Sequence, residues 1–94
     1  AAIIIEQRQI LSDALKQIEG LLAYPSQANF ILFKAPKAQE LFDYLKANGI
    51  LIKNLSGAPK LTNCLRVTVG DNNQNKQFIS IVKEFYSLKM NNND

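Results

Sequence analysis

Histidine is absent from the 94 residues, and Cys64 is the single cysteine. Without histidine, the chain cannot build a metal site of histidines and cysteines, or a histidine-based catalytic pair, from its own residues. One cysteine cannot form an internal disulfide, which makes the cytoplasm the expected location. No apolar run approaches the roughly 18 residues that a membrane span needs, so we expect no membrane partner.

Size and charge narrow the class of protein further. Ninety-four residues make one domain of ordinary globular composition, with 47% apolar residues. Such a chain buries one core but has no room for a cavity that encloses a cofactor. The net charge of +3 is small and the lysines are scattered, so nucleic-acid binding is not indicated.

Two stretches in the first half of the chain show the apolar periodicity of amphipathic helices. The first runs from Ile3 to Leu22. Because no capping residue precedes it, we interpret residue 1 as lying inside a helix or just before one. The second helix is expected from Ala38 to Asn48, with Gly49 at the position that follows a helix end.

A third helix is predicted near the end of the chain. Asp71 followed by Gln74 resembles a capping box, and the helix then runs to about Lys89. We interpret residues 1–90 as the folded domain and residues 91–94 as a polar tail. The apolar stripe expected to face the core consists of Phe78, Ile81, Val82, Phe85 and Leu88.

Strands are predicted over Ala28–Lys34, Ile50–Lys53 and Cys64–Val69. The first is apolar almost throughout, which predicts burial on both faces. In the third, alternation puts Arg66 and Thr68 on the face opposite to Leu65, Val67 and Val69.

The predicted order of elements is therefore α-β-α-β-β-α. This order favours an α/β fold of the α+β type, a two-layer sandwich in which helices cover a small three-stranded sheet.

Three of these segments carry recognisable motifs. Residues 24–33 read YPSQANFILF, residues 49–54 read GILIKN, and residues 64–70 read CLRVTVG. In this order and spacing they resemble the C-terminal part of histidinol-phosphate aminotransferases, where the motifs PS-x-ANF-x-L-F, GI-x-VR and CLR-[IV]-TVG occur. Residues 7–11 also resemble the helix that precedes the small domain in that family. The similarity covers nearly the whole chain.

The resemblance implies the small C-terminal domain of an enzyme of the aspartate aminotransferase-like group, which uses pyridoxal 5'-phosphate. The implied reaction transfers an amino group between histidinol phosphate and 2-oxoglutarate, a step of histidine biosynthesis. The family's Schiff-base lysine lies in a large domain of the same polypeptide, and the complete enzyme is a homodimer. No lysine here stands in the family's Ser-x-Ser-Lys context, so we expect the chain alone to bind no cofactor, to contain no catalytic residue and to be inactive.

Arg66 and Lys53 are the candidate substrate-binding residues. The resemblance implies that Arg66 faces the active site and binds an anionic group, and the planar guanidinium matches carboxylate or phosphate oxygens. Lys53 stands where many family members have arginine next to the substrate phosphate. Lysine keeps the charge but loses the bidentate fork, which puts the preference for phosphate over carboxylate in doubt.

Four other features have structural interpretations. Asn29 is expected to form a structural hydrogen bond, and Tyr24 to pack at the corner between helix and strand. Cys64 is interpreted as an inert buried thiol, because no neighbouring base is evident. The backbone at Gly70-Asp71 could bind an anion at the helix start, but the Asp71 carboxylate would repel it, so capping is preferred.

Two alternatives remain open at this level. One is a stand-alone α/β module that binds a ligand or RNA or has a regulatory role, and the other is an interaction domain without chemistry. Phe30 and Phe33 are aromatic, but no RNP-like motif accompanies them. We predict an unusually apolar surface patch that includes Ile31 or Phe33, because the missing domain should cover it. A charged, well-solvated face there would favour the stand-alone module.

Overall fold

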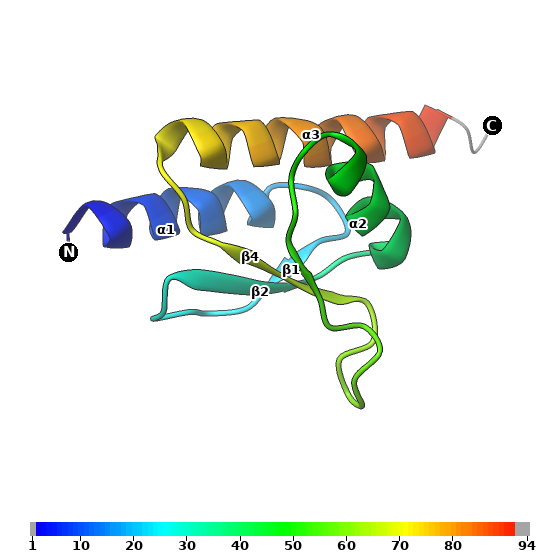
Figure 1. Ribbon diagram of the computed structural model, residues 1–94, viewed down its shortest axis with the longest axis horizontal. Coiled ribbons are helices and arrows are strands. Elements are labelled where there is room, and N and C mark those ends of the chain that lie inside the picture. Colours follow the sequence, from blue (N-terminus) through cyan, green and yellow to red (C-terminus); the bar gives the residue numbers. More distant parts are fainter. Residues whose placement is uncertain (1, 92–94) are drawn as a thin grey trace.

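The computed structural model describes residues 2–91 and contains three helices and four strands (Figure 1). The helices and strands, in chain order, are α1 (Ala2–Lys16), β1 (Leu22–Ala23), β2 (Phe30–Lys34), α2 (Ala38–Ala47), β3 (Lys53–Asn54), β4 (Cys64–Thr68) and α3 (Asn72–Asn91). The two-layer fold with helices over a small sheet is confirmed. The sheet has four strands, however, not three.

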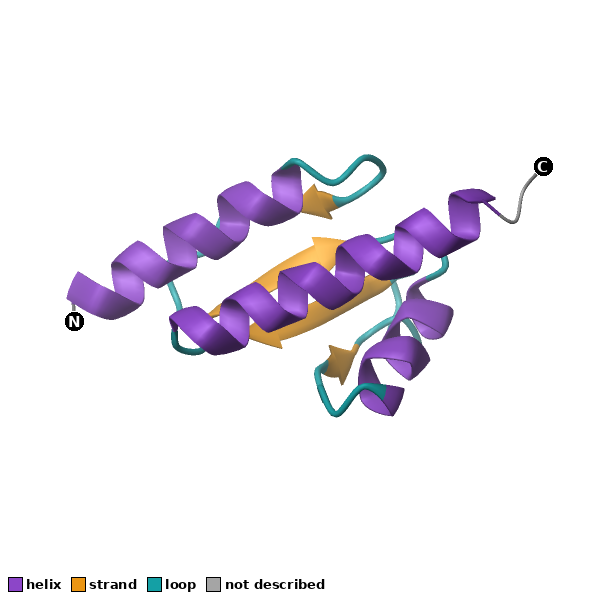
Figure 2. Ribbon diagram, turned by 90° about the horizontal axis from the view of Figure 1, so that it is seen from above, coloured by secondary structure: helices purple, strands orange, loops and turns teal. Residues whose placement is uncertain are grey.

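The sheet is antiparallel throughout, in the order β1-β2-β4-β3. The two five-residue strands β2 and β4 form its centre, and the two edge strands have only two residues each. Short edge strands offer few free backbone groups to another chain, which limits edge-to-edge association. All three helices lie on one side of this sheet, with α1 and α3 side by side (Figures 1 and 2). Within residues 2–91, the opposite face carries no helix.

The core lies between the helices and one face of the sheet. Ile31 and Phe33 of β2 and Leu65 and Val67 of β4 point into it and are almost fully buried. The core side chains from the helices are Leu11, Leu15, Ala38, Leu41, Leu45, Phe78, Val82 and Phe85. The core positions expected for α3 are confirmed, except that Leu88 is exposed and Ile81 only partly buried.

The helix expected to run to Leu22 ends at Lys16, so that prediction was wrong over its last six residues. Turn-type hydrogen bonds follow, and Gly20 adopts a positive φ of 90° that side chains disfavour. This turn sends the chain into β1, where Leu22 pairs with Lys34. Leu22 fits the spacing of the apolar residues of the helix, but it lies in β1.

The strand expected over Ile50–Lys53 begins three residues later, at Lys53. The end of α2 explains the shift: Gly49, with φ 82°, donates its N–H to Lys46, and the N–H of Ile50 donates to the carbonyl of Leu45 at 2.9 Å. These two hydrogen bonds form a Schellman motif, which the glycine at position 49 predicted. Because it engages Ile50, the chain becomes free to pair with β4 only further on.

The capping box at the start of α3 is confirmed. The N–H of Gln74 donates to the Asp71 carboxylate at 2.8 Å, and the N–H of Asp71 donates to the Gln74 side chain at 2.9 Å. A Cβ at Gly70 would collide with that same Gln74 side chain. Glycine at position 70 therefore leaves room for the cap.

The two faces of β2 differ, so burial on both faces was a wrong prediction for this chain. Ile31 and Phe33 have no exposed surface, whereas Phe30 and Leu32 are half-buried on the face without helices. The apolar patch expected at Ile31 or Phe33 is therefore absent, because both side chains point under the helices. The uncovered face is mixed, with apolar Leu22, Phe30 and Leu32 beside basic Lys34, Lys53 and Arg66.

The ends of the chain add two points. Residue 1, interpreted as lying in a helix or just before one, and residues 92–94 of the expected tail lie outside the described residues. Asn91, the first residue of the expected tail, still belongs to α3. Within the described part of the chain, no helix has both the length and the apolar composition of a membrane span.

We expect Asp71→Ala to destabilise the first turn of α3 by about 1 kcal/mol, because the Gln74 N–H loses its acceptor. Hydrogen–deuterium exchange of the complete protein would then be faster in a peptide that covers residues 71–75. Asp71→Asn, which keeps an acceptor oxygen, and Asp43→Ala on α2 are the matched controls and should leave this peptide unchanged. Equal exchange in Asp71→Ala and the unmodified protein would contradict a stabilising role of the cap.

Candidate functional site

Arg66 and Lys53 lie next to each other on the uncovered face of the sheet. Arg66 is the middle residue of β4, and its register partners are Leu32 on β2 and Lys53 on β3. Directly opposed residues in antiparallel strands project from the same face, with Cβ atoms about 5 Å apart. The prediction that Arg66 lies on the face opposite to Leu65 and Val67 is confirmed, and the pairing of β3 with β4 brings Lys53 to the same face.

The Arg66 guanidinium is half-buried and stacks over the Phe30 ring, with its central carbon 4.8 Å from the ring centroid. Lys53 is exposed. Among the side chains of residues 3–89, none forms an ion pair or hydrogen bond with either cation. The single ion pair in this range joins Lys89 and Glu40, at the helical side of the molecule. The two charges therefore remain available to an external anion.

Like charges directly opposite each other in a sheet are destabilising. An anion between Arg66 and Lys53 would remove that repulsion, and the guanidinium fork suits a carboxylate or phosphate group. Lys53 is exposed on this face, so the anion would need a further wall from another part of the protein to be shielded from water. Chemically, this arrangement has the charge and the donors to bind and orient an anionic group.

The other residues singled out from the sequence contribute hydrogen bonds or packing to the fold. The backbone carbonyl of Asn29 accepts a hydrogen bond from the Val69 N–H at 2.8 Å, and its side chain is exposed. Tyr24 is half-buried and its N–H donates to the Leu32 carbonyl. Cys64 is buried, as expected.

The residues present do not fit a site for pyridoxal phosphate. A lysine that forms a Schiff base with a bound cofactor is held in a desolvated pocket. Eight of the nine lysines are exposed, and the ninth, Lys89, is half-buried and paired with Glu40. Nor do the described residues contain a group of three acidic or cysteine side chains that could hold a metal ion.

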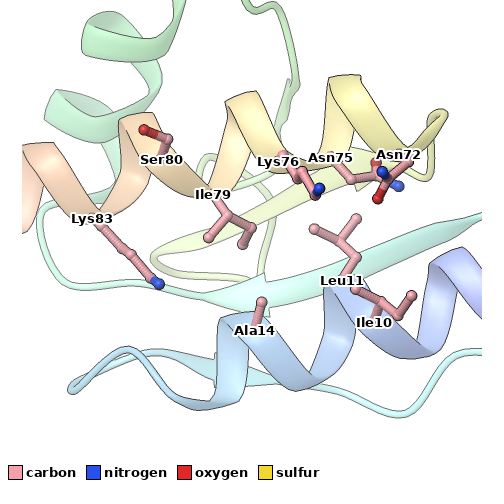
Figure 3. Close-up of a pocket in the computed structure, with 9 residues that line it drawn as sticks. All are labelled: Ile10, Leu11, Ala14, Asn72, Asn75, Lys76, Ile79, Ser80 and Lys83. Carbon is pink, nitrogen blue, oxygen red and sulfur yellow. The ribbon is translucent and has the colours of Figure 1, made fainter.

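A separate groove of about 350 Å³ lies between α1 and α3, on the helical side (Figure 3). Leu11, Ala14 and Ile79 make it apolar, and the side chains of Lys76 and Lys83 extend at its border. These two lysines are seven residues apart on one helix, about 10 Å along its axis, so they cannot hold the same small anion together. The groove also lies away from Arg66, so we do not include it in the site.

Phe30 is the site residue that sequence reasoning missed. It was considered only as a possible base-stacking residue within an apolar run. Alternation from Phe33 would have placed it on the same face as Leu32, but its position beside Arg66 depends on the register of β2 with β4. That register is a tertiary property that single-strand periodicity does not contain.

Comparison with known proteins adds independent information. The family model for aminotransferase class I and II matches residues 1–82. The histidinol-phosphate aminotransferase of Vesicomyosocius okutanii subsp. Calyptogena okutanii (strain HA) is 62% identical over 87 residues, which cover 93% of this chain and 25% of the relative. The chain therefore spans about a quarter of the length of the curated relatives it matches.

Two solved structures share the fold. The histidinol-phosphate aminotransferase from Clostridium acetobutylicum superposes with a TM-score of 0.82 at 22% identity, over 89% of this chain and 26% of that one. The L-threonine-O-3-phosphate decarboxylase from Porphyromonas gingivalis gives a TM-score of 0.80 at 28% identity, over 88% and 27%. Because the family model matches well over half of its residues, this chain belongs to the class I and II aminotransferase family.

Proposed function

We propose that this chain is the C-terminal small domain of a histidinol-phosphate aminotransferase, in which Arg66 and Lys53 bind an anionic group of the substrate. The complete enzyme would transfer an amino group between histidinol phosphate and 2-oxoglutarate in histidine biosynthesis. The observation that carries the proposal is the pair of adjacent cations on the uncovered face, without a counter-charge among the described side chains. The 62% identity to a curated enzyme of that name supports the choice of substrate.

The chemistry of the site fits substrates that carry phosphate or carboxylate. The dianion of a phosphate monoester can accept both in-plane donors of Arg66 and still interact with the Lys53 ammonium as a point charge. A monocarboxylate saturates the guanidinium fork and leaves less charge for Lys53. We therefore expect the phosphate of histidinol phosphate to engage both residues.

The remaining machinery would come from outside these residues. We propose that pyridoxal 5'-phosphate and its Schiff-base lysine belong to a large domain of the same polypeptide, which supplies the amino-transfer chemistry. Residues 1–90 would form the small domain, closing over the substrate to exclude water and complete the anion site. The complete enzyme is proposed to be a cytoplasmic homodimer, and the 94-residue chain alone to be inactive.

A stand-alone ligand-binding, RNA-binding or regulatory module is the weaker hypothesis. Nothing in the comparisons supports it, and Phe30, an aromatic residue on the uncovered face, is already in contact with the Arg66 guanidinium. An RNA-binding sheet needs such a ring to be free for stacking on a base.

The decisive experiment is substitution of Arg66 in the complete enzyme. Hydrogen bonds to charged groups contribute about 1.5–3 kcal/mol, so Arg66→Ala should lower kcat/KM for histidinol phosphate about 10- to 150-fold. Arg66→Lys keeps the positive charge but loses the two parallel donors of the guanidinium. Its kcat/KM should lie between that of the unmodified enzyme and that of Arg66→Ala. Steady-state kinetics with histidinol phosphate measures both.

Arg8 is the other arginine of the chain and lies on α1, where it donates to the Ala28 carbonyl. Arg8→Lys is therefore the matched control and should stay within about two-fold of the unmodified enzyme. If Arg66→Ala also stayed within two-fold, the proposed anion site would be wrong.

Lys53 generates a second prediction, which separates binding from stability. Lys53→Gln removes one of two opposed like charges, so the melting temperature should stay the same or rise. The KM for histidinol phosphate should nevertheless increase about five- to ten-fold, the equivalent of about 1–1.4 kcal/mol. Lys46→Gln on α2 is the charge-matched control and should leave KM unchanged. A fall in KM, or an equal rise in both variants, would exclude Lys53 as a phosphate ligand.

A further inference from the structure

We propose that Phe30 is a positioning residue that fixes the Arg66 guanidinium for anion binding. The inference rests on the proposed function of Arg66 and adds a second residue, which controls the orientation of the guanidinium. Phe30 begins β2 and pairs with Thr68, so it is the diagonal neighbour of Arg66 on the uncovered face. The central guanidinium carbon lies over the ring, 4.8 Å from its centroid, well within the range of a cation–π contact.

The contact is the one described interaction that complements the Arg66 charge. The direct partners of Arg66 across the sheet are Leu32, which offers no polar group, and Lys53, which repels it. No carboxylate among residues 3–89 pairs with the guanidinium. Phe30 and Lys53 lie on opposite sides of β4, on β2 and β3 respectively. The ring therefore holds the Arg66 guanidinium toward β2, and without it the long arginine side chain would be free to swing into solvent.

The contact with Phe30 leaves the hydrogen-bonding capacity of Arg66 free. The ring carries no acceptor oxygen, so none of the five N–H donors of the guanidinium is used in a conventional hydrogen bond to it. Phe30 can thus orient Arg66 without occupying any of the donors that an anion would use. Ordering the side chain before binding lowers the entropy cost that binding would otherwise carry. Among the described residues no aromatic ring contacts Lys53, so Arg66 is the one of the two cations that a ring orients.

The test replaces the ring by an aliphatic side chain in the complete enzyme. Loss of a partly exposed cation–π contact should raise the KM for histidinol phosphate, and the inhibition constant of inorganic phosphate, about two- to five-fold for Phe30→Leu. The kcat should change by less than two-fold, because Phe30 acts through Arg66 and not on the reacting atoms. Phe30→Tyr retains the ring and should keep both constants near those of the unmodified enzyme. Phe30→Met serves as a second ring-free variant if Phe30→Leu does not fold.

Two comparisons give the test its specificity. Phe42 of α2 is also half-buried but packs against the core, so Phe42→Leu is the matched control for loss of a ring and should leave both constants unchanged. In the Arg66→Ala background, Phe30→Leu should have no further effect on either constant. A full additional effect there, or an unchanged inhibition constant in both ring-free variants, would overturn the positioning role.

The outcome also separates this inference from the proposed function. If Arg66→Ala weakens substrate and phosphate binding but Phe30→Leu and Phe30→Met do not, only the role of Phe30 is wrong. If Arg66→Ala itself has no effect, the proposed anion site is wrong, and the role of Phe30 with it.

Discussion

Strand alternation in β4 is the constraint on which the other features depend. Leu65 and Val67 are held in the core against the helices, so the residue between them must point to the opposite side. A shift of register by one residue would bury the Arg66 guanidinium and expose two core side chains, at a cost of several kcal/mol. The free energy of core packing therefore also fixes the direction of Arg66. The same pairing with β2 and β3 brings Phe30 and Lys53 to its two sides.

Much of the fold could be predicted because local signals agreed with tertiary structure. Gly49 and the pair Asp71 and Gln74 marked helix ends by specific hydrogen bonds, and these form as expected. The alternation of residues 64–68 predicted both the strand and the two faces. In each case the chemistry that stabilises the element lies within a few residues of sequence, where pattern reasoning is strongest.

The errors arose where a distant part of the chain decides the local structure. Leu22 fits a helical period, but Gly20 turns the chain and β2 supplies a strand partner. Residues 50–52 are apolar enough for a strand, but the end of α2 engages Ile50 first. Ile31 and Phe33 were expected near the surface because the sequence does not say which face of β2 the helices cover. The contact between Phe30 and Arg66 likewise needs the register of two strands separated by more than thirty residues.

The two cations of the site differ in how firmly the fold holds them, and this difference bears on how the site can evolve. Arg66 belongs to a central strand, and its chain neighbours Leu65 and Val67 are core residues. Any change in the backbone of β4 at this point would therefore disturb the packing of the whole sandwich. Lys53 belongs to a two-residue edge strand that follows a loop, and it contacts the rest of the sheet on one side only. A substitution at position 53 therefore disturbs the core less than one at position 66. The edge strand gives the proposed anion site one position whose side chain can be exchanged at little thermodynamic cost.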